Sequence, residues 1–197
     1  MTTRRDFLRA GGLGLAGLAV AAPLGGWGWA PSPARGANPA APVVVRMRSD
    51  ALGARVWFDP AGLRVTPGTI VRWVVEANVH STTAYHPGNA NFALRLPTNA
   101  EPWDSGILTQ PGQTYEHRFR IPGLYDYYCT PHELAGMVGR ILVLPEDDPG
   151  RDLREPDPAA DGRRPPSKAA RSAFPPIDLV LRQGIVRIPT PGQEATR

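Results

Sequence analysis

Short apolar runs separated by turn sequences fill the middle of the chain, and this pattern constrains the fold more than any other feature. In residues 115–121, tyrosine, histidine, phenylalanine and isoleucine alternate with charged residues, which is typical of a strand with one buried face. Pro67-Gly68 and Pro122-Gly123 are turn sequences. Because no run has the 3.6-residue period of a helix, the sequence predicts an all-β sandwich or barrel between Val43 and Leu144.

The remaining predicted strands share a β-branched and apolar composition. They are Val43 to Arg48, Val56 to Phe58, Leu63 to Val65, Ile70 to Val75, Leu124 to Tyr128 and Val138 to Leu144. Residues 80–109 are the least regular part of this region, and a long connection inside a compact domain is often functional. We expect this connection to place His80 at one end of the sandwich and to pack Trp103 over part of it.

The chain's only cysteine lies in a short loop with two other side chains that bind soft metals. Cys129 is followed by His132 three residues later and by Met137 after five more. A thiolate, an imidazole and a thioether suit copper that cycles between Cu(I) and Cu(II). A lone cysteine is more often a small buried apolar residue. Here the histidine and methionine at these offsets favour a metal ligand instead.

A blue-copper site has two histidines and one cysteine in a plane, with a weak axial methionine, so one histidine is still needed. His80 is the best candidate because it follows the strand-like run that ends at Glu76. His86 precedes a proline in a loop, and His117 lies inside a predicted strand, so both compete less well. The predicted copper ligands are His80, Cys129, His132 and the axial Met137.

These residues resemble the copper loop of plastocyanin and pseudoazurin, which are cupredoxins. The resemblance is carried by Cys-x2-His-x4-Met after Tyr-x-Tyr-Tyr, and by the Val-Gly-Arg-Ile-Leu-Val run that begins at Val138. It covers roughly residues 43–144 and implies a Greek-key β-sandwich with one mononuclear copper ion. In those families the residue after the first histidine is commonly Asn. Here it is Ser81, which leaves the reduction potential and the link between the ligand loops open.

The resemblance also implies how electrons move. His132 would be the exit to the surface, within a small apolar patch formed by Pro131, Leu134, Ala135 and Gly136. Tyr128 matches a surface tyrosine that gives plastocyanin a second, remote route, although an ordinary surface tyrosine explains it equally well. In a strand, Tyr128 would point away from the side taken by Cys129.

The implied function is that of a monomeric electron carrier, not an enzyme. It would shuttle one electron between redox proteins outside the cytoplasmic membrane: a cytochrome or membrane electron-transfer complex, and a terminal oxidase or reductase. A multicopper oxidase or copper nitrite reductase needs further ligands, and the chain has four histidines and no His-x-His pair. A periplasmic copper-delivery protein is the alternative, but three methionines are few for that role.

Residues 1–37 are predicted to be an export signal and linker. The segment Thr3 to Arg9 resembles a twin-arginine motif and is followed by an apolar run from Ala10 to about Leu24. That run has roughly 14 residues, fewer than the ~20 that span a bilayer. We therefore expect a periplasmic or other extracytoplasmic protein. If the signal is not cleaved, it would tether the protein to the membrane.

The charge balance argues against nucleic acid as a partner. The net charge of the whole chain is +4. Residues 1–37 hold four of the arginines and one aspartate, so the remainder has 18 basic and 17 acidic residues, a net charge of +1. The chain has no long basic block and no interleaving of basic and aromatic residues, which excludes nucleic-acid binding.

The composition changes after Pro145, so the predicted parts are residues 1–37, a cupredoxin domain at 38–145 and a C-terminal extension at 146–197. The extension holds nine of the 23 prolines. Glu146 to Lys168 is predicted to be a disordered linker. The apolar segments 174–181 and 185–188 are predicted to dock on the domain or on a partner.

Overall fold

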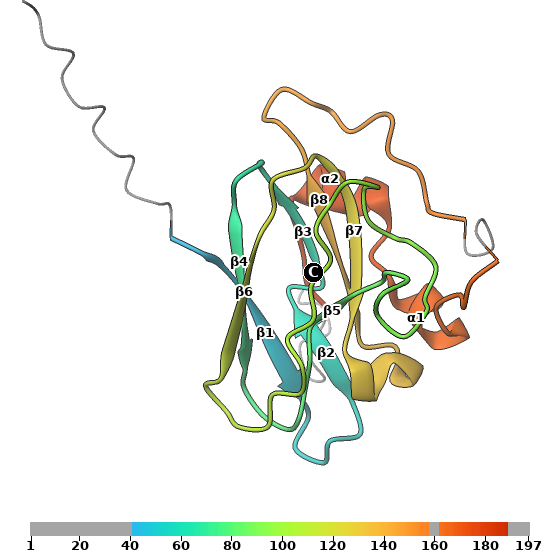
Figure 1. The fold of residues 1–197 in the computed structure, drawn as a ribbon. Coiled ribbons are helices and arrows are strands. Elements are labelled where there is room, and N and C mark those ends of the chain that lie inside the picture. The colour runs from blue at the N-terminus through green and yellow to red at the C-terminus, as the bar shows by residue number, and fades with distance from the viewer. Residues whose placement is uncertain (1–40, 158–161, 189–197) are drawn as a thin grey trace, which may run out of the picture. The chain divides into compact units, whose positions relative to one another are not determined.

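The computed structural model describes residues 41–157 and 162–188, so the predicted twin-arginine signal lies outside the described residues. Strands in the described part form two facing sheets (Figure 1). The first has the order β2-β1-β4-β6, with β1 at Val43–Ser49, β2 at Val56–Asp59, β4 at Ile70–Val75 and β6 at Thr114–Arg118. The second has the order β5-β7-β8-β3-β9, with β3 at Gly62–Val65, β5 at Thr83–Ala84, β7 at Gly123–Tyr128, β8 at Val138–Val143 and β9 at Ile185–Val186. The predicted all-β sandwich is confirmed.

The predicted ligand loop closes a hairpin in the second sheet. β7 and β8 pair antiparallel, with Tyr128 opposite Val138, and the 3-10 helix η1 (Thr130–Ala135) lies between them. β3 runs parallel to β8 on its other side. Since β8 begins just after η1, the C-terminal ends of the parallel strands β3 and β8 lie at the opposite end of the sheet from this loop.

Aromatic rings fill the space between the sheets. In β4, Val71, Trp73 and Val75 are buried and alternate with more exposed neighbours. The Trp73 ring lies 5.4 Å from Tyr127 of β7 and 5.7 Å from Trp103, measured between ring centroids. Trp103 is 3% exposed, and its indole N–H donates to Thr82 Oγ1 at 3.0 Å. The expected packing of Trp103 on the sandwich is therefore confirmed.

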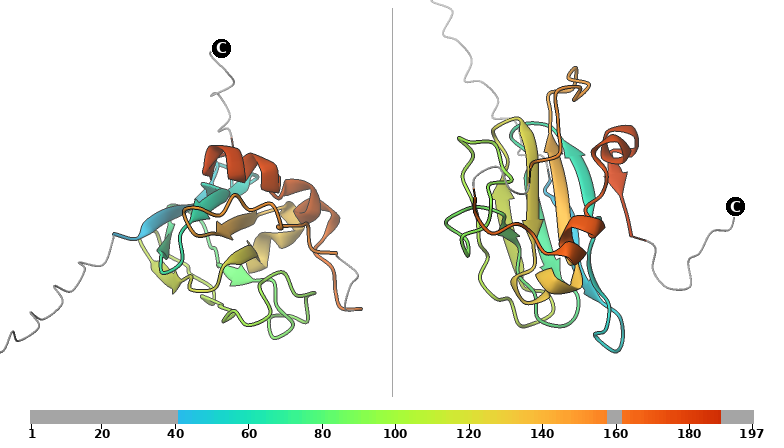
Figure 2. Two further views of the ribbon diagram at one scale, coloured as in Figure 1. Left: turned by 90° about the horizontal axis from the view of Figure 1, so that it is seen from above. Right: turned by 90° about the vertical axis from the view of Figure 1, so that its right-hand side faces the viewer.

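The C-terminal extension adds an edge strand to the second sheet and places two short helices on its outer side (Figure 2). They are α1 (Lys168–Ala173), α2 (Ile177–Gln183) and β9, which pairs antiparallel with β3. Val180 and Val186 pack there against leucines of β7 and β8. Within residues 41–157 and 162–188, no helix has both the length and the apolar character needed to cross a bilayer. The boundaries of the three predicted parts stay predictions.

A buried ionic cluster also joins the extension to the sheet. The Asp126 carboxylate accepts hydrogen bonds from Arg95 at 2.9 Å and from Arg140 at 2.8 Å, and all three side chains are at most 4% exposed. Arg140 also donates to Glu155 at 2.8 Å. Both guanidinium groups lie over the Phe174 ring, 4.9 and 5.1 Å from its centroid. Because an unpaired buried charge costs several kcal/mol, the cluster depends on Glu155, which belongs to the predicted linker.

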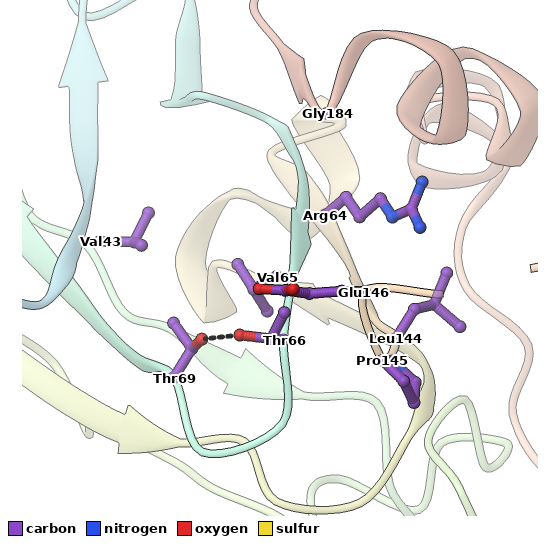
Figure 3. A pocket seen from close by; sticks show the side chains of 9 residues that line it. All are labelled: Val43, Arg64, Val65, Thr66, Thr69, Leu144, Pro145, Glu146 and Gly184. Carbon is purple, nitrogen blue, oxygen red and sulfur yellow. Dashed lines mark hydrogen bonds between the residues drawn. The ribbon is translucent and has the colours of Figure 1, made fainter. Parts of the chain in front are cut away.

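An open groove of about 450 Å³ lies at the end of the sheet opposite η1 (Figure 3). Its lining combines Thr66 and Thr69, in the turn between β3 and β4, with Leu144 and Glu146 after β8. The four predicted copper ligands do not line it. The groove is therefore separate from the predicted metal site.

Gly139 tests the packing of the hairpin. It lies opposite Tyr127 in the β7–β8 register, and a Cβ at this position would lie 2.2 Å from the Tyr127 ring. We predict that Gly139→Ala lowers the free energy of unfolding of the metal-free protein by about 1–3 kcal/mol because the added methyl overpacks the core. Urea unfolding measures this change. Leu52→Ala, at a side chain that is 91% exposed, is the control and should change it by less than ~0.5 kcal/mol. Equal effects of both substitutions would contradict the packing.

Candidate metal centre

Three of the four predicted ligands converge on one point. The ligand atoms of His80, Cys129 and His132 all lie within 4.8 Å of one another. The Cys129 Sγ is 3.6 Å from Nδ1 of His80 and 3.3 Å from Nδ1 of His132. The two imidazoles therefore present the same ring nitrogen to one sulfur, with their ring centroids 5.1 Å apart.

His80 is held by backbone and side-chain contacts. The backbone N–H of His80 donates to the Leu108 carbonyl at 3.0 Å, and the backbone N–H of Leu108 donates to the His80 carbonyl at 2.8 Å. The imidazole is fully buried, and its Nε2 lies 3.3 Å from the Ser49 hydroxyl at the end of β1. A hydrogen bond at Nε2 orients the ring and leaves Nδ1 for the metal. Sequence reasoning missed Ser49, because nothing local marks a strand-end serine as a partner of a residue 31 positions away.

The two competing histidines lie elsewhere. Nδ1 of His86 accepts a hydrogen bond from the Gly88 N–H at 3.0 Å, within its own loop. The His117 ring stacks on Trp103 at 4.8 Å, and burial lowers its pKa. Neither contributes to the group formed by His80, Cys129 and His132. The geometry thus favours His80 as the second histidine.

Backbone hydrogen bonds close the loop that carries the other ligands. The Cys129 N–H donates to the Met137 carbonyl at 3.0 Å, and the Met137 N–H donates to the His132 carbonyl at 3.1 Å. Gly136 has φ of 80°, a left-handed conformation that favours glycine, so the chain can turn back into β8. Met137 is fully buried and belongs to the same apolar cluster as Cys129.

Ser81 links the two segments that carry the ligands. Its N–H donates to the Cys129 sulfur at 3.3 Å. Its Oγ accepts from the Thr130 N–H at 2.7 Å and lies 3.0 Å from the Thr130 hydroxyl. The serine hydroxyl therefore supplies a link between the ligand loops, which the sequence alone left open.

Burial sets the charge of the metal-free site. It raises the pKa of the Cys129 thiol to about 11, against the opposing effect of hydrogen bonds from Ser81 and the His132 backbone. Burial, and then the nearby His132, lowers the pKa of His80 to about 4. Burial also lowers the pKa of His132. At neutral pH the imidazoles are ready to bind a metal, whereas Cys129 must release a proton when it does so.

His132 is the predicted ligand that approaches the surface. His80, Cys129 and Met137 are all 0% exposed, whereas His132 is partly exposed. Leu134, two residues further along η1, is 75% exposed. An apolar side chain thus lies on the protein surface within a few residues of the metal site.

Tyr128 is not a surface residue, so that expectation was wrong. It is 3% exposed, and its ring lies 4.5 Å from Tyr85 and 5.0 Å from Phe92. Ala170 of α1 is buried in the same cluster. The extension therefore covers the face on which Tyr128 would otherwise be exposed.

The donor set fits copper. One sulfur and two imidazole nitrogens, with a buried methionine in the same loop, match the soft and borderline donors of a blue-copper site. Zinc also accepts cysteine and histidine, but its sites usually have four tetrahedral ligands, whereas three strong donors converge here.

Comparison with known proteins agrees with this geometry. The family model described as copper binding proteins, plastocyanin/azurin family, matches residues 45–144. A plastocyanin of Synechococcus sp. (strain JA-2-3B'a(2-13)) is 38% identical over 113 residues, which cover 54% of this chain and 77% of that protein. A chloroplastic plastocyanin of Chlamydomonas reinhardtii is 53% identical over 90 residues, 44% of this chain and 57% of the relative.

Among solved structures, pseudoazurin from Methylobacterium extorquens AM1 matches with a TM-score of 0.49 and 22% identity, over 73% of this chain and 98% of that one. The family match covers half of the chain and includes all four predicted ligands. The chain belongs to the plastocyanin/azurin family of copper-binding proteins, and His80, Cys129 and His132 form its potential site for one copper ion.

Proposed function

We propose that this protein is a mononuclear blue-copper electron carrier in which His80, Cys129 and His132 bind the ion and Met137 is the weak axial ligand. The observation that carries the proposal is the convergence of one buried sulfur and two imidazole nitrogens within 4.8 Å. Membership of the plastocyanin/azurin family supports it.

Bound copper would supply reversible one-electron exchange between Cu(I) and Cu(II). The chain's part is to hold the donors still, since the two oxidation states prefer different geometries and movement between them slows electron transfer. The closed loop 129–137 and the Ser81 link both restrict such movement. The complete burial of His80 and Cys129 keeps water away from these donors.

Electrons would enter and leave through His132, the proposed ligand that is partly exposed. Pro131, Leu134 and Ala135 would form the apolar docking patch around it, which suits short-lived complexes. The burial of Tyr128 argues against a second route through that side chain.

The cellular setting is part of the proposal. The paired arginines at positions 4 and 5, with the short apolar run that follows, support export by the twin-arginine route and an extracytoplasmic location. The redox partners would be a cytochrome or membrane electron-transfer complex and a terminal oxidase or reductase. The carrier would act as a monomer, tethered if its signal is retained.

The visible spectrum of the copper-loaded, oxidised protein tests the function. We predict a strong absorption band in the orange-red that Cys129→Ser abolishes, because the band requires a copper–thiolate bond. His86→Ala, which removes a histidine outside the site, should leave the band unchanged. A colourless protein that binds only Cu(I) would instead favour copper delivery.

Ser81→Ala tests the link between the ligand loops. The variant keeps the backbone N–H that donates to the sulfur but loses the hydroxyl that accepts from Thr130. We predict that it still binds one copper ion and that its reduction potential, measured by protein-film voltammetry, differs from that of the wild type. Thr69→Ala removes a hydroxyl in the turn between β3 and β4 and is the control. If the potentials of Ser81→Ala and Thr69→Ala both equal the wild-type value, Ser81 does not tune the site.

A further inference from the structure

Glu133 connects the ligand loop to the C-terminal extension. It follows His132 directly and is only 4% exposed. Its Oε1 accepts hydrogen bonds from the Tyr85 hydroxyl at 3.0 Å and from the Ser167 N–H at 2.7 Å. The Ser167 hydroxyl donates to the Glu133 backbone carbonyl at 3.2 Å. The extension thus holds both the side chain and the backbone of this one residue.

Helix α1 is seated directly against η1, as the two views of Figure 2 show. Ser167 caps α1, since its Oγ accepts from the Ala170 N–H at 3.1 Å. Ala170 is fully buried. On the loop side, a Cβ at Gly136 would lie 3.3 Å from the Ala169 carbonyl oxygen. The loop and α1 are therefore in close contact at Gly136.

Glu133 is also the anchor of η1. It is the buried residue of this element, whereas Pro131, Leu134 and Ala135 are exposed. Its Oε2 is buried and has no hydrogen-bond partner in the described part of the chain. Burying a carboxylate is costly unless hydrogen bonds compensate it. The donors that compensate Glu133 are Tyr85 from the domain and Ser167 from the extension.

We propose that residues 162–176 of the extension are a positioning element for the metal centre, with Glu133 and Ser167 as the residues through which it acts. By fixing Glu133, the extension fixes the loop that places His132 and Met137. The effect on copper rests on the proposed function, whereas the effect on the loop itself does not. In this proposal Glu133 acts through the loop backbone, since its carbonyl accepts from the Gly136 N–H.

Hydrogen exchange of the metal-free, full-length protein tests the effect on the loop. The reporters are the amides of Gly136 and Met137, which donate to the carbonyls of Glu133 and His132. We expect both to exchange roughly tenfold faster or more in Glu133→Ala, and several-fold faster in Ser167→Ala, because the loop opens locally when its anchor is lost. Glu133→Gln keeps an oxygen acceptor of the same shape and should stay close to wild type.

The amides of Val71 and Trp73 in β4 are internal controls and should not change. Unchanged exchange at Gly136 and Met137 in both Glu133→Ala and Ser167→Ala overturns the proposal. If the β4 amides exchange faster by the same factor as the loop amides, the proposal is also overturned, since the substitution would then have destabilised the whole protein. If Glu133→Ala does not fold, Ser167→Ala and Glu133→Gln carry the same comparison.

The copper-loaded protein provides the second readout. The reduction potential should shift in Glu133→Ala and Ser167→Ala and return to the wild-type value in Glu133→Gln, while the orange-red band persists in all three. If the loop amides exchange faster but the reduction potential stays at the wild-type value, the extension does not position the metal centre. If the wild type itself lacks the band, the proposed function fails, but the exchange data still decide whether the extension holds the loop.

Discussion

The hydrogen bond from the Ser81 N–H to the Cys129 sulfur joins two parts of the chain that are 48 residues apart in sequence. It brings the segment that carries His80 to the loop that carries Cys129 and His132. A metal site built from distant segments needs such a contact, because the loop 129–137 alone does not supply the second imidazole, which comes from His80. The copper site proposed above depends on this junction, because it holds His80 beside the sulfur of Cys129.

The junction is rigid because strands hold it from both sides. β7 and β8 enclose the ligand loop, and the aromatic core under Trp73 keeps the two sheets together. The cost of this arrangement is a buried thiol whose pKa is raised to about 11. A bound copper ion would compensate for that cost, since it would stabilise the thiolate that the apolar surroundings disfavour. The same burial that makes the thiol a poor acid keeps water out of the site.

The C-terminal extension covers one face of the second sheet. Its helices lie on the outer side of the second sheet, β9 extends the edge of that sheet, and Phe174 packs beneath Arg95 and Arg140. This packing buries Tyr128 and leaves His132 as the proposed ligand that approaches the surface. One appended segment would thus both support the ligand loop and restrict the electron to a single route.

Much of the fold and of the candidate site could be predicted from the sequence, because local patterns carry that information. Strand alternation and turn residues marked the sandwich, and the spacing of Cys129, His132 and Met137 marked one side of the site. His80 was chosen over His86 and His117 because it follows a strand-like run, and its Nδ1 lies 3.6 Å from the sulfur of Cys129. Ser49 and Ser167 are partners that no local pattern indicates, since a serine at a strand end or before a helix is common.

The extension was the least predictable part for a physical reason. Its helices have six and seven residues, too few to show helical periodicity, and prolines flank them. Its order depends on tertiary contacts such as those of Glu155 with Arg140, which composition does not reveal. The expectation of a surface Tyr128 failed because it considered the domain without this cover.

X-ray absorption at the copper edge of the loaded protein counts the donor atoms around the ion and so decides whether His80, Cys129 and His132 bind it. We expect one short copper–sulfur bond and two copper–nitrogen bonds from imidazoles, with the sulfur contribution lost in Cys129→Ser. A first coordination shell made only of nitrogen and oxygen, or one imidazole instead of two, would contradict this expectation.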